Sequence, residues 1–265
     1  MFERHAHQAA GLNAGPLYDS ASLVPVVSPA QPARAYDMLY QLASQLDSMG
    51  YTPVILDASA SEGPEGHRSA GRPLGLIHAL SSSSMARIER PVQGDWLVMP
   101  AAQGVRSLQV TARAGGARVA VSRLLSPFGR QTVVLLFASA QDIASLLGGI
   151  DNSVMVPVLA HPQAGIDAYA AFKHLHQSGL RPVLAPLADA QLSAQASTVN
   201  QVVRSVADCA GRHLGVRAEI WPVRRWGELA CEGAITRTLS YDMDNLHDSG
   251  NIGNITHAEV GTYWS

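Results

Sequence analysis

Apolar and polar positions follow two different periodicities along the first ordered part of the chain. A continuous apolar run covers residues 23–27, and a second one covers residues 54–56, just after Gly50. Between them, apolar side chains recur at helical spacing, at Leu39, Leu42, Ala43 and Leu46. Apolar runs of this length predict buried strands, and the i, i+3, i+4 spacing predicts a helix that ends at the glycine. The stretch is therefore a predicted βαβ unit, with its two strands expected as parallel neighbours.

The same alternation continues toward the C-terminal end. Further strands are predicted in four apolar runs, at residues 94–100, 132–137, 154–160 and 181–187, with a last short one at 218–223. Helical spacing is found at residues 74–80, 105–125, 162–178 and 191–215. Uninterrupted apolar strands are typical of parallel sheets covered on both faces. We therefore predict an α/β fold with a doubly wound, mostly parallel sheet flanked by helices.

The length of 265 residues is enough for one such domain. We expect an N-terminal arm at 1–22, which contains the Gly15-Pro16 break, and an α/β domain at 23–239. Residues 240–265 are rich in Asn, Asp and Gly and lack periodicity, so we expect a loosely structured C-terminal tail.

Charge, cysteine content and hydrophobicity argue against nucleic-acid binding, a disulfide or zinc scaffold, and a membrane anchor. The net charge is −2, from 19 basic and 21 acidic residues, so nothing indicates the basic surface that nucleic acid requires. Cys209 and Cys231 match no disulfide or zinc pattern, and we expect core thiols in a reducing cytoplasm. No segment approaches 18 consecutive apolar residues, and residues 240–265 contain no Lys or Arg for a basic membrane-binding helix. We therefore expect a soluble cytoplasmic protein without a membrane anchor.

Ligands in doubly wound sheets usually bind at the turn after the first strand. Here residues 28–37 read SPAQPARAYD. With its flanking elements, this stretch resembles the opening of the MinD/ParA family of P-loop ATPases, whose loop reads SGKGGVGKTT. Two later strings extend the resemblance: PAxxG at Pro100, Ala101 and Gly104, and DAYxxxKxL at Asp167, Ala168, Tyr169, Lys173 and Leu175. The resemblance implies the MinD-like P-loop NTPase fold.

The chemistry of that loop is absent. A phosphate loop uses glycines to aim consecutive backbone N–H groups at the phosphate, a lysine charge, and a hydroxyl on Mg²⁺. Residues 28–37 contain no glycine, and Ala30 and Ala35 occupy the two lysine positions. Tyr36 occupies the position of the magnesium hydroxyl, while Pro29 and Pro32 each lack an N–H.

Two acidic positions of the family have also changed. In the family's D-x-D string, Asp57 remains but Ser59 replaces the second acid, and Phe137 replaces the switch acid, although a phenyl ring cannot ligate a hard cation. Phosphoryl transfer depends on the charge and metal clamp that these positions supply. We therefore predict a pseudo-ATPase with no catalytic residues, no metal site and no ATP or Mg²⁺ as cofactor. What remains is a vestigial loop site: Ser28, Arg34, Tyr36 and Asp57.

Residues 5–12 carry a second resemblance. The sequence HAHQAAGL is similar to the D-Q-A-x-x-L-R element of the FlhG branch, the flagellar-number regulators, in which it stimulates the GTPase FlhF. Gln8, Ala9 and Leu12 match, whereas His7 and Asn13 replace the acid and the arginine. The resemblance implies that these three residues contact a protein partner, such as an FlhF-type GTPase or another flagellar assembly component.

The leading hypothesis is a non-catalytic regulator of flagellar biosynthesis or placement that acts through protein–protein contacts. Two alternatives stay open: a nucleotide-binding switch or ATPase of the MinD/ParA type with a rebuilt pocket, and a small-molecule sensor in which Arg34 meets an anion. We expect Asp57 to have a structural role, as a helix N-cap or in a turn, and Trp226 to point into the core.

Overall fold

The computed structural model describes residues 21–62, 75–81, 96–187 and 193–236. The sheet consists of β1 (Ser22–Val27), β2 (Thr52–Asp57), β3 (Leu97–Pro100), β4 (Thr132–Ala138), β5 (Ser153–Val158), β6 (Arg181–Pro186), β7 (Glu219–Ile220) and β8 (Ile235–Thr236). Within the described ranges it has eight strands, in the order β3-β2-β4-β1-β5-β6-β7, with β8 antiparallel to β1. All other pairings are parallel.

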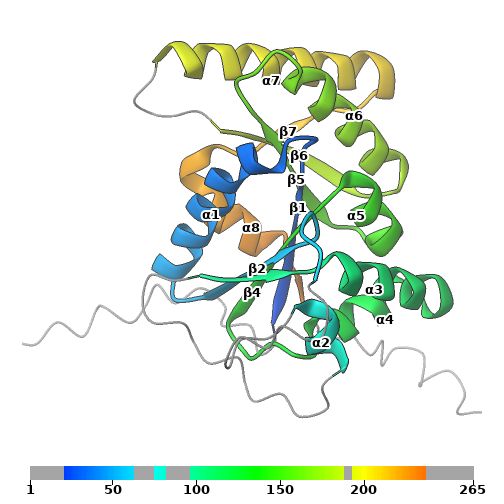
Figure 1. Ribbon diagram of the computed structural model, residues 1–265. Coiled ribbons are helices and arrows are strands. Elements are labelled where there is room, and N and C mark those ends of the chain that lie inside the picture. The colour runs from blue at the N-terminus through cyan, green and yellow to red at the C-terminus, as the bar shows by residue number, and fades with distance from the viewer. Residues whose placement is uncertain (1–20, 63–74, 82–95, 188–192, 237–265) are drawn as a thin grey trace, which may run out of the picture.

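Helices cover both faces of the sheet (Figure 1). The helices are α1 (Tyr36–Ser48), α2 (Leu76–Ser81), α3 (Ala102–Gly115), α4 (Ala117–Leu125), α5 (Ala140–Leu147), α6 (Ala164–Gln177), α7 (Ser193–Leu214) and α8 (Trp226–Glu232), with 3-10 turns at η1 (Pro32–Ala35) and η2 (Val223–Arg225). Apolar side chains of α1 and α8 pack on one face, and those of α2 to α7 pack on the other. The predicted doubly wound, mostly parallel α/β fold is confirmed.

One prediction about the sheet is wrong: β1 and β2 are parallel but not neighbours. Strand β4 lies between them and pairs with both. All seven residues of β4 are buried, as expected of a central strand. The crossover through α1 is long enough to pass over one intervening strand, because neighbouring strands are only about 4.8 Å apart.

The last part of the fold also differs from expectation. The strand predicted at 218–223 is limited to Glu219–Ile220, and α5, α8 and β8 were not predicted. Helix α8 is positioned by α1: the Gln45 side chain accepts a hydrogen bond from the Gly227 N–H (2.8 Å) and donates one to the Val223 carbonyl (2.8 Å). Trp226 is fully buried, as predicted, and its indole N–H donates to the Trp221 carbonyl (2.8 Å).

Three predicted features fall outside the described residues. The arm residues Gln8, Ala9 and Leu12 are among them, as is the C-terminal tail at 240–265. The side chain of Arg34 is also outside the described part, although its backbone belongs to η1.

Candidate functional site

The turn after β1 forms a 3-10 turn rather than an open cradle of N–H groups. The Ser28 N–H donates to the Ala138 carbonyl (2.7 Å), so the loop begins by continuing the sheet pairing. Pro29 follows, and Pro32 begins η1, which runs directly into α1. Neither proline has an N–H, so the donors of residues 29 and 32 are missing from the series that a phosphate loop aims at an anion.

Ala35, at the position of the family's second lysine, is fully buried. It packs in the core between α1 and the sheet, next to the apolar side chains of α1. A lysine at this point would place its stem, and with it its charge, against close-packed apolar atoms. The turn therefore has no room for a lysine side chain at residue 35, whereas Ala30, at the first lysine position, is exposed.

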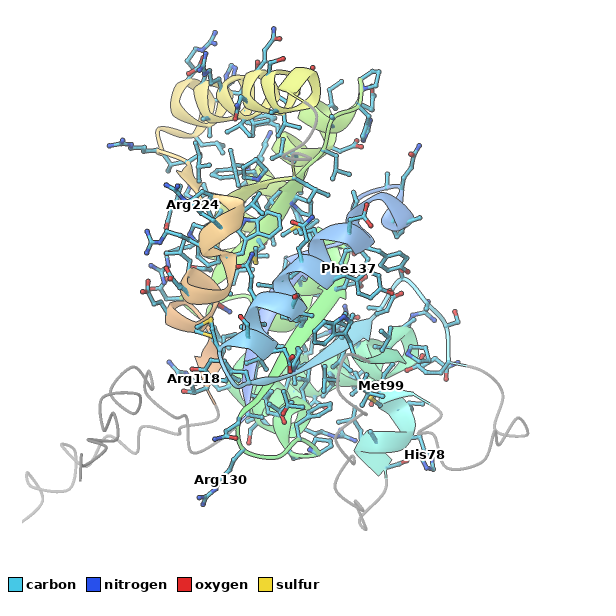
Figure 2. The ribbon with its side chains drawn as sticks, turned by 90° about the vertical axis from the view of Figure 1, so that its left-hand side faces the viewer. His78, Met99, Arg118, Arg130, Phe137 and Arg224 are labelled. Atoms are coloured by element: carbon cyan, nitrogen blue, oxygen red, sulfur yellow. The ribbon has the colours of Figure 1, made fainter. Side chains whose placement is uncertain are left out.

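The structure brings together four positions that the sequence had separated: Tyr36, Asp57, Ser59 and Phe137, which we call the Tyr36 cluster. The Tyr36 hydroxyl donates to Asp57 Oδ2 (2.6 Å). The ring centroids of Tyr36 and Phe137 are 5.7 Å apart, and Phe137 is the register partner of Asp57 where β2 and β4 end. Figure 2 shows Phe137 beside α1, and its side chain is fully buried there.

Asp57 has its acceptor oxygens occupied by the protein itself. Oδ1 accepts hydrogen bonds from the Ser59 N–H (2.9 Å) and the Ser59 hydroxyl (2.6 Å), in the turn that was expected of this residue. With the Tyr36 bond, the carboxylate receives three donors while only 5% of the residue is exposed. The hydrogen bond to Asp57, followed by burial, raises the pKa of the Tyr36 hydroxyl above its ordinary value. The cluster is thus an internally satisfied hydrogen-bond network beside an apolar ring.

Glu62 is a buried charged residue that sequence reasoning missed. Its carboxylate accepts hydrogen bonds from the Gln103 N–H (2.6 Å) and the Gly104 N–H (2.8 Å), in the first turn of α3. It satisfies donors that a helix leaves free at its start, and its negative charge suits the positive end of the helix dipole. The bond fastens the segment after β2 to α3. No local signal marks Glu62, because its partners are backbone groups far along the chain.

Gly104, the glycine of the PAxxG string, is required by close packing between two helices. A Cβ on Gly104 would lie 2.5 Å from the side chain of Leu76, a fully buried residue of α2. The close approach of α2 to α3 therefore requires glycine here.

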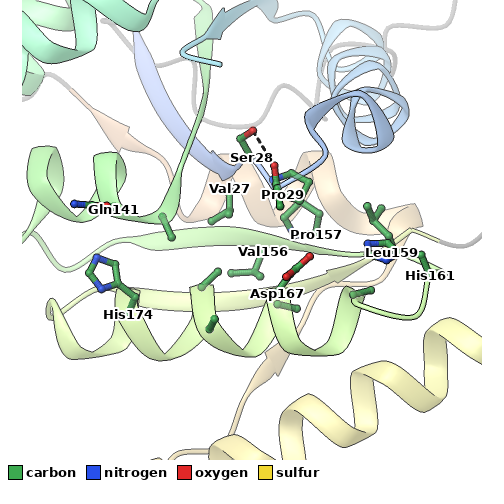
Figure 3. A pocket seen from close by; sticks show the side chains of 16 residues that line it. Val27, Ser28, Pro29, Gln141, Val156, Pro157, Leu159, His161, Asp167 and His174 are labelled. Carbon is green, nitrogen blue, oxygen red and sulfur yellow. Dashed lines mark hydrogen bonds between the residues drawn. The ribbon is translucent and has the colours of Figure 1, made fainter. Parts of the chain in front are cut away.

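A cavity of about 340 Å³ lies at the carboxyl ends of β1 and β5. Figure 3 shows it between the loop after β1 and helix α6. Its walls are mainly apolar, and its polar side chains include Ser28, Gln141, His161, Asp167 and His174. Of the vestigial loop residues, Ser28 lines this cavity, whereas Tyr36 and Asp57 belong to the cluster.

Neither a metal-ligand cluster nor a membrane-spanning helix occurs in the described ranges. They contain no group of three or more His, Cys, Asp or Glu residues arranged to hold a metal ion. None of the helices described here combines the length and the apolar character that a membrane crossing needs.

No protein-family model and no curated protein sequence matches the chain. Among solved structures, the fold is similar to that of a McdA variant from Cyanothece in complex with ATP, with a TM-score of 0.50, 12% identity, and coverage of 82% of this chain and 88% of that one. Apo McdA (TM-score 0.49, 12% identity, 80% and 90% coverage) and a protein described as a partition protein (0.40, 11%, 81% and 65%) are also similar. At this identity the likeness to the ATP complex shows the fold alone, an α/β P-loop NTPase-like fold.

Proposed function

We propose that this chain is a pseudo-ATPase, a P-loop NTPase-like domain without nucleotide chemistry that regulates other proteins by direct contact. The observation that carries the proposal is the Tyr36–Asp57 hydrogen bond of 2.6 Å, next to the buried ring of Phe137. The resemblance to the MinD/ParA family places the magnesium hydroxyl and two acids at these three positions. Here a tyrosine, a hydrogen-bonded aspartate and a phenyl ring occupy them.

The charged residues around the turn support the same proposal. Transfer of a phosphoryl group needs positive charge and a metal ion around the phosphates. In the described residues of the turn, alanines occupy both lysine positions, and the one retained acid already accepts three protein hydrogen bonds. A magnesium ion would have to displace the Tyr36 and Ser59 donors from Asp57, and it would gain no second carboxylate in return.

A hydrolysis assay tests the proposal. Purified full-length protein incubated with Mg-ATP should release no phosphate above the protein-free rate, and ATP should leave its sedimentation coefficient unchanged. Asp57→Asn and Asp37→Asn serve as a matched pair, because Asp37 is an exposed acid in the first turn of α1. Turnover that is lost in a folded Asp57→Asn variant and kept in Asp37→Asn would refute the proposal in favour of an ATPase with a rebuilt pocket.

The partner is the second part of the proposal. We infer from the similarity of residues 5–12 to the flagellar-number regulators that Gln8, Ala9 and Leu12 dock on an FlhF-type GTPase. Deletion of residues 1–14 should abolish capture of this GTPase in a pull-down. The melting temperature should stay nearly unchanged, because the arm is short and is separated from β1 by the Gly15-Pro16 break. Undiminished capture after the deletion would exclude the arm as the docking element.

A further inference from the structure

The cavity between β1 and β5 lies where the connections of two adjacent strands diverge. From β1 the chain crosses through α1 toward β2, and from β5 it crosses through α6 toward β6, on the opposite side of the sheet order. Such a divergence opens a crevice outside the carboxyl ends of the strands, and this is where open α/β sheets usually bind ligands. The Tyr36 cluster belongs to the core on the α1 face, whereas the Val27 and Val156 walls of the cavity belong to the core on the α6 face.

The walls of the cavity suit an apolar body. They include Val27, Pro29, Val156, Pro157 and Leu159 from the two strand ends, with small alanines of α6 opposite. The volume of about 340 Å³ is near the lower end for small-molecule pockets. A ligand of about ten non-hydrogen atoms would fit this volume.

Among the described residues that line the cavity, the acidic one is Asp167. Asp167 projects from α6 toward the strand ends in Figure 3, and it is half-buried. Its carboxylate has no hydrogen bond or ion pair with any side chain in the part of the chain that the structure describes, and no described lining residue is Lys or Arg. An acid in the first turn of a helix also meets the helix dipole, but that role does not require it to stand over an apolar cavity. An unpaired carboxylate in apolar surroundings favours a cationic partner.

His161 lines the cavity with its ring held in a defined orientation. Its Nδ1 accepts a hydrogen bond from the Gln163 N–H (3.1 Å), so the imidazole is held with Nε2 as the free nitrogen. His174 lies at the other end of the cavity, near Gln141 (Figure 3). Neither histidine neutralises Asp167 through a contact in the structure.

We propose that this cavity binds a small organic ammonium ion, with the apolar body against the strand ends and the ammonium group on the Asp167 carboxylate. The site is distinct from the Tyr36 cluster, and it shares Ser28, Pro29 and Ala30 with the loop after β1. It makes the chain a binder of small amines as well as a protein-contact domain.

Three probes of similar shape test the charge requirement: 2-phenylethylamine, the neutral 2-phenylethanol and the anionic 3-phenylpropionate. Ligand-observed NMR titration of the full-length protein should show the ammonium probe binding at least about tenfold more tightly than the alcohol, because hydrogen bonds to charged groups are the stronger ones. The carboxylate probe should bind least. Equal affinity for the three probes, tighter binding of the carboxylate, or no saturable binding of any probe would overturn the proposal.

Substitutions test whether the preference for the ammonium probe comes from Asp167 and from this cavity. Asp167→Asn should remove the preference for the ammonium probe, and the exposed first-turn acid Asp37 provides the matched control, Asp37→Asn, which should keep it. Ala170 is exposed and lines the cavity, so Ala170→Phe should weaken the binding of all probes, whereas the same change at exposed Ala114 on α3 should not. A preference that survives Asp167→Asn in a protein with an unchanged melting temperature would also overturn the proposal.

Discussion

Replacing Tyr36 by phenylalanine removes one hydroxyl and keeps the ring. The ring contact with Phe137 is retained, so no cavity opens, and the change isolates the hydrogen bond to Asp57. Asp57 Oδ2 loses the hydrogen bond from Tyr36 in a residue that is only 5% exposed, while Oδ1 keeps both bonds from Ser59. The variant thus leaves one buried carboxylate oxygen without its protein donor.

The expected cost follows from that geometry. Hydrogen bonds to charged groups contribute about 1.5–3 kcal/mol when their partner is left buried. Because Tyr36 is only half-buried and water can replace part of the lost bond, we expect Tyr36→Phe to lower the free energy of unfolding by about 1–2 kcal/mol. For a domain of this size, the melting temperature should fall by about 2–8 °C.

Urea denaturation followed by circular dichroism measures this difference. The control is Tyr40→Phe on the same helix, since Tyr40 is 47% exposed and its hydroxyl has no partner among the residues described. The control should change the free energy of unfolding by less than about 0.5 kcal/mol. If Tyr36→Phe is as neutral as Tyr40→Phe, the Tyr36–Asp57 bond does not stabilise the fold and the reasoning is wrong.

The contribution of Tyr36 to the free energy of unfolding should decrease at high pH. Because the pKa of Tyr36 is raised in the folded state above its ordinary value of 10.0, its contribution to stability is complete below that pH. It is lost as the pH rises through the folded-state pKa, where a phenolate would face the Asp57 carboxylate. The difference in the free energy of unfolding between the wild type and Tyr36→Phe should therefore shrink as the pH is raised above 10.0, and a difference that grows there would contradict the assignment.

Three further predictions concern other parts of the fold. Ala35→Lys should lower the free energy of unfolding by more than about 2 kcal/mol, because Ala35 is fully buried. Ala30→Lys, at an exposed position, should be nearly neutral in the same urea assay. Neither variant should bind ATP. Glu62→Gln should lower the free energy of unfolding by about 1 kcal/mol at low salt, and by less at high salt, because it removes a negative charge from the start of α3. Burial raises the pKa of Cys231 to about 11, so iodoacetamide at about pH 8 should label the half-buried Cys209 first, as read by mass spectrometry, and equal labelling of both thiols would contradict the buried position.

The central strands were predictable because they are buried on both faces. Strand β4 is a continuous apolar run in the sequence for the same reason that all seven of its residues are buried in the structure. The order of the strands was not predictable in this way, since a local pattern does not tell which later strand inserts between β1 and β2.

Of the two helices that were not predicted, α5 has a start signal in the sequence and α8 has none. Helix α5 has a readable start, since the Ser139 hydroxyl accepts from the Asp142 N–H (3.1 Å) as a side-chain cap. Helix α8 has only seven residues and includes Gly227, and contacts with Gln45 hold it in place. Its formation depends on tertiary contacts that no local pattern contains.

The sequence could predict that the residues of the Tyr36 cluster lie at the same edge of the sheet. Tyr36 follows the first turn, and Asp57 and Phe137 each lie at the end of an apolar run, so a parallel sheet places them at one edge. Their direct hydrogen bond and ring contact required the side-chain positions. The acid Asp167 was noted only as part of a family string, because the sequence does not show that it faces a cavity.

Calorimetric titration of Mg-ATP into the full-length protein tests most directly whether the Tyr36 cluster has replaced the nucleotide site. The account predicts no saturable heat with nucleotide concentrations up to about 1 mM, with or without Mg²⁺. Saturable binding below that concentration, abolished when Mg²⁺ is chelated, would show a working metal–phosphate site and contradict the account.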